Sequence, residues 1–220
     1  MNYRHFEDDN NPRVLKLEGF RHLDRAIEAC AKHQIYTIID MHTAPGGQNG
    51  GWHCDSAVHI AGASRYECVS ECRDQPFRFV TRPGFWLHKD FQDRLVWLWA
   101  QVAKRYKDNP WVAGYNPMNE PADPHGTGLV QFYDRVYEAI RSVDENHILF
   151  LDGNTYSIDF SAFPDDAKER WKNTAYAIHD VSIHPMDRWN AKQLISAISM
   201  RYMDSRPLLS PMTGHRNRSI

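Results

Sequence analysis

The chain has 220 residues, of which 42% are hydrophobic and 25% are charged, so it is long enough to form one sizeable core. A net charge of −2 gives no basic surface for nucleic acid, and no apolar run reaches the ~18 residues of a membrane span. The first residues lack the apolar core of a signal peptide, which predicts a cytoplasmic protein as read, or an extracellular one if residues precede Met1.

Hydrophobic periodicity predicts helices that alternate with short strands. Apolar residues at helical spacing predict a helix over 19–33, and the β-branched run over 35–40 predicts a strand buried on both faces. The alternation continues with helices at 91–106, 129–143, 165–171 and 190–203, and with strands at 111–116, 147–151 and 174–179. Such alternation is typical of a parallel α/β sheet.

Polar residues follow each predicted strand. The carboxyl ends of parallel strands meet at one edge of an open sheet or at one face of a barrel, so these side chains are expected to form one site. No glycine-rich phosphate motif follows a strand, so no nucleotide cofactor is predicted. The residues at the predicted strand ends are Asp40 and His42, Asn119 and Glu120, Asp152, and His179.

The segment 115–121 carries the strongest chemical signal. It reads Tyr-Asn-Pro-Met-Asn-Glu-Pro and places Glu120 just after a strand, with Asn119 before it. Cleavage of a glycosidic bond needs an acid that protonates the leaving oxygen and a second carboxylate that attacks or stabilises the sugar. The alternative is a structural glutamate at a strand end.

Asn-Glu-Pro at this place resembles the acid/base signature of glycoside hydrolase family 5, and its context is similar to the fungal cellulase and exo-1,3-β-glucanase members. The resemblance implies a (β/α)₈ TIM-barrel fold, with Glu120 as the catalytic acid/base and Asn119 as a donor to the sugar 2-hydroxyl. It also implies a carbohydrate substrate, no cofactor, no metal and a monomer.

Three further residues are candidates for substrate binding. The segment 39–49 resembles the third-strand region of the family, which implies that His42 lines the sugar site, although it could instead cap the following loop. His179 resembles the histidine that ends the sixth strand, although residue 181 is Val where the family has Tyr, and a structural role stays open. Trp52 is a candidate for stacking on a sugar ring, whereas Trp97, Trp99 and Trp111 are expected in the core.

The resemblance covers roughly 1–62 and 85–203, which correspond to strands three to six of the barrel, with 2–6 resembling the end of the second strand. We therefore expect an incomplete barrel domain over 1–204 and a divergent tail over 205–220. The segment 63–84 has no clear period and is expected to be a retained intron or a surface insertion outside the core.

The family nucleophile is a glutamate after the seventh strand, and no such residue is found in this chain. The glutamates after Glu120 are Glu138, Glu145 and Glu169, each in a predicted helix or turn. The expected function is retaining hydrolysis of a β-glucan or β-glucoside, with activity of this chain left open. The alternatives are a non-catalytic carbohydrate-binding remnant and a metal-dependent hydrolase that uses Asp40, His42 and His179.

Overall fold

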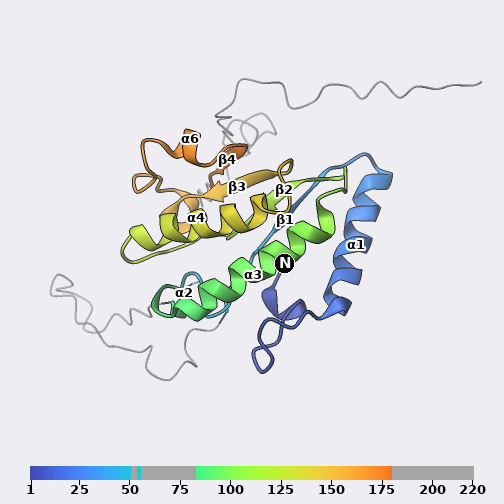
Figure 1. Ribbon diagram of the computed structural model, residues 1–220, viewed down its shortest axis with the longest axis horizontal. Coiled ribbons are helices and arrows are strands. Elements are labelled where there is room, and N and C mark those ends of the chain that lie inside the picture. Colours follow the sequence, from blue (N-terminus) through green and yellow to red (C-terminus); the bar gives the residue numbers. More distant parts are fainter. Residues whose placement is uncertain (51–53, 56–82, 180–220) are drawn as a thin grey trace, which may run out of the picture.

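A computed structural model describes residues 1–50, 54–55 and 83–179 of the chain. Within these ranges the strands form one parallel sheet in the order β1-β2-β3-β4 (Figure 1). The strands are β1 (Thr37–Asp40), β2 (Val112–Asn116), β3 (Ile148–Asp152) and β4 (Thr174–Ala177). The predicted α/β alternation is therefore confirmed over this part of the chain; β1, β2 and β4 are one or two residues shorter than predicted, and β3 has the predicted length but begins one residue later.

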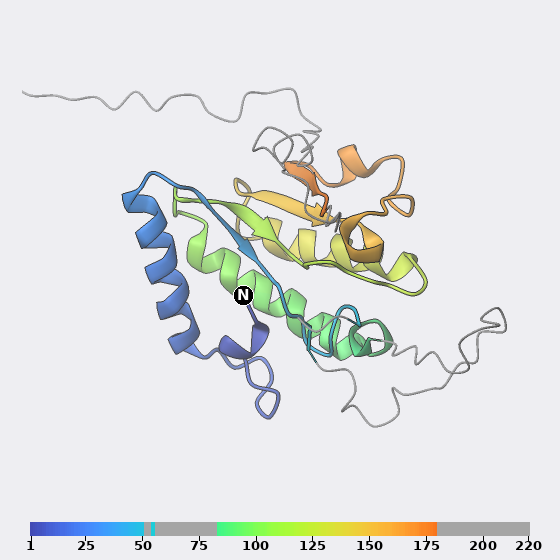
Figure 2. The same cartoon turned by 180° about the vertical axis from the view of Figure 1, so that it is seen from behind.

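Three long helices cover one face of the sheet, and the shorter helices lie in the segments before and between the longer elements. α3 and α4 lie side by side with α1 next to α3 (Figure 1), and the view from behind shows the strands in front of these helices (Figure 2). The long helices are α1 (Leu17–Lys32), α3 (Lys89–Tyr106) and α4 (Thr127–Arg141). The short ones are η1 (Tyr3–His5), α2 (Gly84–Leu87), α5 (Asn154–Ser157) and α6 (Ala167–Arg170).

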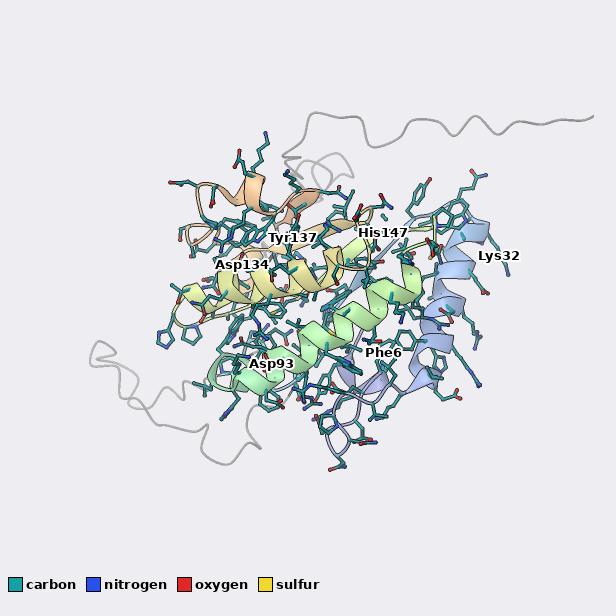
Figure 3. The ribbon with its side chains drawn as sticks, in the orientation of Figure 1. Phe6, Lys32, Asp93, Asp134, Tyr137 and His147 are labelled. Atoms are coloured by element: carbon teal, nitrogen blue, oxygen red, sulfur yellow. The ribbon has the colours of Figure 1, made fainter. Side chains whose placement is uncertain are left out.

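The hydrophobic core lies between this helical layer and the sheet. Trp99 of α3 has no exposed surface, and its ring packs 5.7 Å from that of Tyr115, which projects from β2 toward the helices. Trp97 and Trp111 are only partly buried at the margin of the same core. Charged contacts join the helices at the surface: Asp93 of α3 pairs with α4, and Asp134 of α4 pairs with the end of α6 (Figure 3).

The prediction that the first strand is buried on both faces is wrong. Ile39 faces the helices and is 2% exposed, whereas Ile38, on the opposite face, is 42% exposed. Within the described residues the long helices cover only one face of the sheet, so the side chains of β1 alternate between core and surface.

The N-terminal segment lies beside β1, as expected for a neighbouring strand, but it pairs only briefly. Asn2 forms a single parallel bridge with Thr43, and the chain then turns into η1. Phe6, which follows this turn (Figure 3), packs edge-to-face on Phe20 of α1, with ring centroids 4.8 Å apart. This contact anchors the segment to the helical layer.

Several sequence predictions lie outside the described residues: Trp52, the helix at 190–203 and the tail at 205–220. For the segment 63–84, the last two residues need correction. Pro83 and Gly84 are both buried, and Gly84 is the first residue of α2. Any insertion outside the core therefore ends by Arg82. In the described part of the chain, no helix has both the length and the apolar character that crossing a membrane requires.

Candidate active site

Four polar side chains from four strand ends meet at the carboxyl edge of the sheet. Nδ1 of His179, just after β4, lies 2.9 Å from Oε1 of Glu120, which follows β2. Nε2 of the same imidazole lies 3.6 Å from Oδ2 of Asp152, the last residue of β3. Asp40, which ends β1, is close enough to interact electrostatically with both His179 and Asp152. The geometric expectation that the strand-end residues gather is thus confirmed for these four.

The backbone of Glu120 has an unusual conformation. Its φ is +48°, in the left-handed region that is unfavourable for a residue with a Cβ atom. The Glu120 N–H donates to Oδ2 of Asp152 at 2.9 Å, while Nδ2 of Asn116 donates to the other oxygen of that carboxylate at 2.8 Å. Asp152 therefore anchors the residue that was predicted to be the catalytic acid.

Asn119 is buried beside Glu120. Its backbone N–H donates to the carbonyl of Met41 at 3.0 Å, which ties the turn after β2 to the end of β1. Its side-chain Nδ2 is buried and has no hydrogen-bond partner among the described residues, and the same holds for Oδ1 of Asp40. Buried donors and acceptors are normally paired, so these two atoms are available to a ligand at the strand ends.

His42 lies next to Asp40 at the end of β1. Its Nδ1 is 3.1 Å from Oδ2 of Asp40, and about half of its side chain is exposed. The imidazole is thus at the same edge as Glu120, and its contact with the carboxylate fixes the orientation of the ring. This placement accommodates both roles considered for His42, a sugar contact and a loop cap.

Burial dominates the electrostatics of the two aspartates. Desolvation raises the pKa of Asp152 to about 6, although the hydrogen bond from the Glu120 amide and the nearby His179 act in the opposite direction. Burial also raises the pKa of Asp40, against the effect of neighbouring positive charges that include His42. The site therefore holds several carboxyl groups that interact closely, which is the setting in which one proton can be retained near neutral pH.

Sequence reasoning missed two amides that hold this site together. Gln48 and Asn49 have no exposed surface, and their side chains donate to the backbone carbonyls of Asn119 and Glu120. The available signal was the position of two amide residues directly after Gly46 and Gly47, at the start of a loop that follows a strand.

The three glutamates that follow Glu120 in the sequence lie away from strand ends. Glu138 is in α4, Glu169 is in α6, and Glu145 is in the turn between α4 and β3, as the sequence predicted. Within the described residues, no group of three or more His, Cys, Asp or Glu side chains is arranged to hold a metal ion.

Comparison with known proteins identifies relatives of this arrangement. The family model described as "Cellulase (glycosyl hydrolase family 5)" matches residues 2–204. A β-xylosidase of Phanerodontia chrysosporium is 59% identical over 183 residues, which are 83% of this chain and 34% of that protein. Endoglucanase C of Acetivibrio thermocellus is 26% identical over 157 residues, which are 71% of this chain and 38% of that protein.

Solved structures share the fold. The crystal structure of a glycoside hydrolase has a TM-score of 0.58 at 19% identity and covers 83% of this chain and 48% of its own. Endo-glycoceramidase II from Rhodococcus sp., as a lactosyl-enzyme intermediate, has a TM-score of 0.57 at 18% identity over 81% of this chain and 47% of its own. This chain thus spans about a third of those curated relatives and about half of the structural neighbours, as expected for part of a (β/α)₈ barrel.

Proposed function

Because this chain belongs to glycosyl hydrolase family 5, we propose that its described residues form the acid/base part of a retaining β-glycosidase, in which Glu120 protonates the leaving oxygen. The observation that carries the proposal is the contact between Glu120 and His179 at the carboxyl edge of the sheet, 2.9 Å apart. An imidazole beside the acid can stabilise either charge state of the carboxyl group, as the acid and base halves of a retaining reaction require.

Two unsatisfied polar atoms support a sugar as the ligand. Nδ2 of Asn119 is a buried donor and Oδ1 of Asp40 is a buried acceptor, both without partners among the described residues. Hydroxyl groups of a pyranose can both accept and donate, so one sugar ring can satisfy the pair. We assign Asn119 to the 2-hydroxyl, and His42 and His179 to the rest of the ring; the role of Trp52 stays a prediction.

We propose a β-glucan or a β-glucoside as the substrate. A β-xyloside is the second candidate, favoured by the name of the 59% identical relative. The two sugars share the equatorial hydroxyls and differ in the hydroxymethyl group on C5. Hydrolysis of matched aryl β-glucosides and β-xylosides separates them: a higher kcat/KM on the glucoside supports the first substrate, and the reverse order supports the second.

A retaining mechanism needs a second carboxylate about 5–5.5 Å from the acid. We propose that this nucleophile is a glutamate outside the present 220-residue sequence, since Glu138, Glu145 and Glu169 lie in helices or a turn. A 2-deoxy-2-fluoro aryl glycoside, which traps the glycosyl-enzyme, tests this directly. Covalent labelling of a carboxylate within this chain, found by mass spectrometry of its peptides, would contradict the proposal.

Glu120→Gln, made in a longer form of the protein that includes the nucleophile, tests the acid itself. We expect kcat on an aryl glycoside with a poor leaving group to fall by about 10²-fold or more, because the substitution removes general acid catalysis. An activated aryl glycoside, which needs little protonation, should lose much less in the glycosylation step. Equal activity of the variant and the parent on both substrates would rule out Glu120 as the acid.

The alternative is a carbohydrate-binding remnant that binds sugar without hydrolysing it. Calorimetric titration with cellobiose and xylobiose, run beside the activity assay, distinguishes this remnant from an enzyme. Binding without hydrolysis supports the remnant, whereas hydrolysis supports the enzyme. Absence of both would contradict the proposed function.

A further inference from the structure

We propose that Gln48 and Asn49 are positioning residues that hold Glu120 in its left-handed backbone conformation and thereby aim its carboxyl group. The inference rests on the proposed role of Glu120 as the acid. It concerns side chains that contact the backbone of the acid rather than the substrate, and both belong to the loop after β1.

Asn49 acts on the carbonyl group of Glu120 itself. Its Nδ2 donates to that oxygen at 2.7 Å, and the Asn49 residue has no exposed surface. A peptide carbonyl determines the rotation of its residue about the Cα–C bond, so a fixed donor at this oxygen fixes ψ of Glu120. The contact spans 71 residues of sequence and links the β1 loop to the β2 loop.

Gln48 acts one peptide earlier. Its Nε2 donates to the carbonyls of both Asn119, at 3.1 Å, and His42, at 2.8 Å, while its Oε1 accepts from the Ala44 N–H at 3.1 Å. All polar atoms of the amide are therefore engaged, which fixes the side chain in one rotamer. The carbonyls on either side of the Glu120 Cα are thus both held by buried amides.

Backbone N–H groups of the turn that carries Glu120 are held as well. The Glu120 N–H donates to Asp152 at 2.9 Å, and the backbone of Gln48 accepts from the Ala122 N–H at 3.0 Å. A strained backbone persists only where its surroundings determine it, and here three side chains and one backbone contact do so. A small misplacement of a catalytic group can cost up to 10²-fold in rate, so this clamp has a consequence for chemistry.

The loop can supply these contacts because of its own conformation. Gly46 and Gly47 both have positive φ, +74° and +75°, and this allows the chain to turn back toward the β2 loop. The indole N–H of Trp86 in α2 donates to the carbonyl of Gln48 at 2.8 Å and holds the loop from the other side. The two amides therefore sit on a loop that is itself fixed.

Amide hydrogen exchange measured by NMR tests the clamp without any need for activity. Asn49→Asp and the neutral Asn49→Leu both remove the donor to Glu120, and each should speed exchange of the Glu120 N–H about tenfold, the effect of losing one buried hydrogen bond. The matched control is Asn154→Asp, which removes a similar buried bond, from Nδ2 of Asn154 to the carbonyl of Asp123 at 3.0 Å. It should change exchange at Glu120 by less than twofold.

Unchanged exchange in the Asn49 variants, or an equal change in the Asn154 control, overturns the proposal. A change in Asn49→Asp without one in Asn49→Leu also overturns it, because the added charge would then be the cause. These results are independent of turnover, so failure of the proposed function is seen separately, as absence of hydrolysis and sugar binding by the parent protein.

Kinetics give the second readout. In a longer form of the protein that includes the nucleophile, Asn49→Leu should lower kcat/KM, which reports the glycosylation step, at least tenfold on an aryl glycoside with a poor leaving group. On an activated aryl glycoside kcat/KM should change less than twofold. This split is specific to a misplaced acid, since loss of folded protein would lower both rates equally. An equal loss on both substrates therefore overturns the proposal.

Discussion

Asp152 is a carboxylic acid with no exposed surface, at the end of a central strand and in contact with the backbone of Glu120. Its two oxygens accept hydrogen bonds from Asn116 and from the Glu120 amide, which favour the charged form. Burial outweighs them and raises its pKa to about 6. The residue therefore has a proton to lose within the ordinary working range of pH.

This shift predicts that Asp152 makes the protein less stable as pH rises. Its pKa is higher in the folded state, about 6, than in the unfolded state, 3.8, so the folded protein binds more protons between these values. The stabilisation is complete below pH 4 and is lost as pH passes 6, with a size on the order of 3 kcal/mol. Urea unfolding of the parent and of Asp152→Asn from pH 4 to 7 should show the parent losing stability relative to the variant.

Asp144 serves as a control, because its pKa is shifted in the opposite direction. It is also buried, but hydrogen bonds from Tyr115 and from the amides of His147 and Asn146 hold its pKa below the usual value. The advantage of the parent over Asp144→Asn should therefore shrink as pH falls toward the folded pKa of this group. Parallel pH profiles for the two aspartate variants would show that the shift assigned to Asp152 is wrong.

Among the individual residues of the site, the sequence identified those that belong to a local motif or follow a predicted strand. Glu120 and Asn119 stand in a recognisable segment, and His42 and His179 follow predicted strands, so their meeting at one edge could be predicted from topology. Gln48 and Asn49 could not be assigned in this way. Their function depends on hydrogen bonds to carbonyls 71 residues away, and no periodicity encodes such a partner.

Among the helices, α3 connects the core to the turn that carries Glu120. Nε1 of Trp99 donates to the carbonyl of Pro117 at 2.9 Å, and Pro117 lies three residues before Glu120. Helical spacing alone predicts that Trp99 belongs to the core. The hydrogen bond adds a second role, because it fixes the exit of the chain from β2.

Trp99→Phe should therefore cost more than burial alone would suggest. The substitution leaves the buried Pro117 carbonyl without its donor and removes part of a ring with no exposed surface. The free energy of unfolding should fall by about 2–4 kcal/mol, from the lost bond and the cavity together. Trp97→Phe, on the half-buried side of the same helix, should cost under about 1 kcal/mol by urea denaturation. Equal losses at the two positions would contradict this account.

Element types were predicted well, and their boundaries less so. The long helices were predicted because their apolar faces repeat every three or four residues, as in α4, where Phe132, Val136 and Ile140 are fully buried. The helices α2 and α5 were not predicted, since four residues are too few to show a period. In α5 the chain also takes left-handed conformations at 155–157, which hydrophobic spacing does not report.

For the molecule as a whole, alternation of strand and helix gave the fold class, but it did not show which face of the sheet is covered. Ile38 is the clearest case, because a β-branched residue in an apolar run reads as buried whether or not anything packs on it. Ion pairs between residues far apart in the sequence join the N-terminal segment to the helical layer. Arg94 of α3 pairs at 3.1 Å with Glu7, which is fully buried beside the N-terminal turn.

The connection from Asp55 to Pro83 offers a test of how this molecule tolerates sequence between its elements. Both flanks lie against Gly47: a Cβ atom added there would stand 2.5 Å from the Asp55 carbonyl, and the Phe85 N–H donates to the Gly47 carbonyl at 3.3 Å. The ends of the connection are therefore close together in the fold. Seven residues, with a reach of roughly 23 Å, are ample to join them.

Deletion of 63–82 should accordingly leave the protein folded. It shortens the connection at 56–82 from 27 residues to the seven at 56–62, and the smaller loop should raise the free energy of unfolding by about 1 kcal/mol through closure entropy. Deletion of 63–84 also removes Pro83 and Gly84, which are buried at the start of α2, and should lower stability instead. Urea denaturation of the two forms measures the difference. If the 63–82 deletion unfolds the protein, or if both deletions have the same effect, the segment belongs to the core and its interpretation as an insertion is wrong.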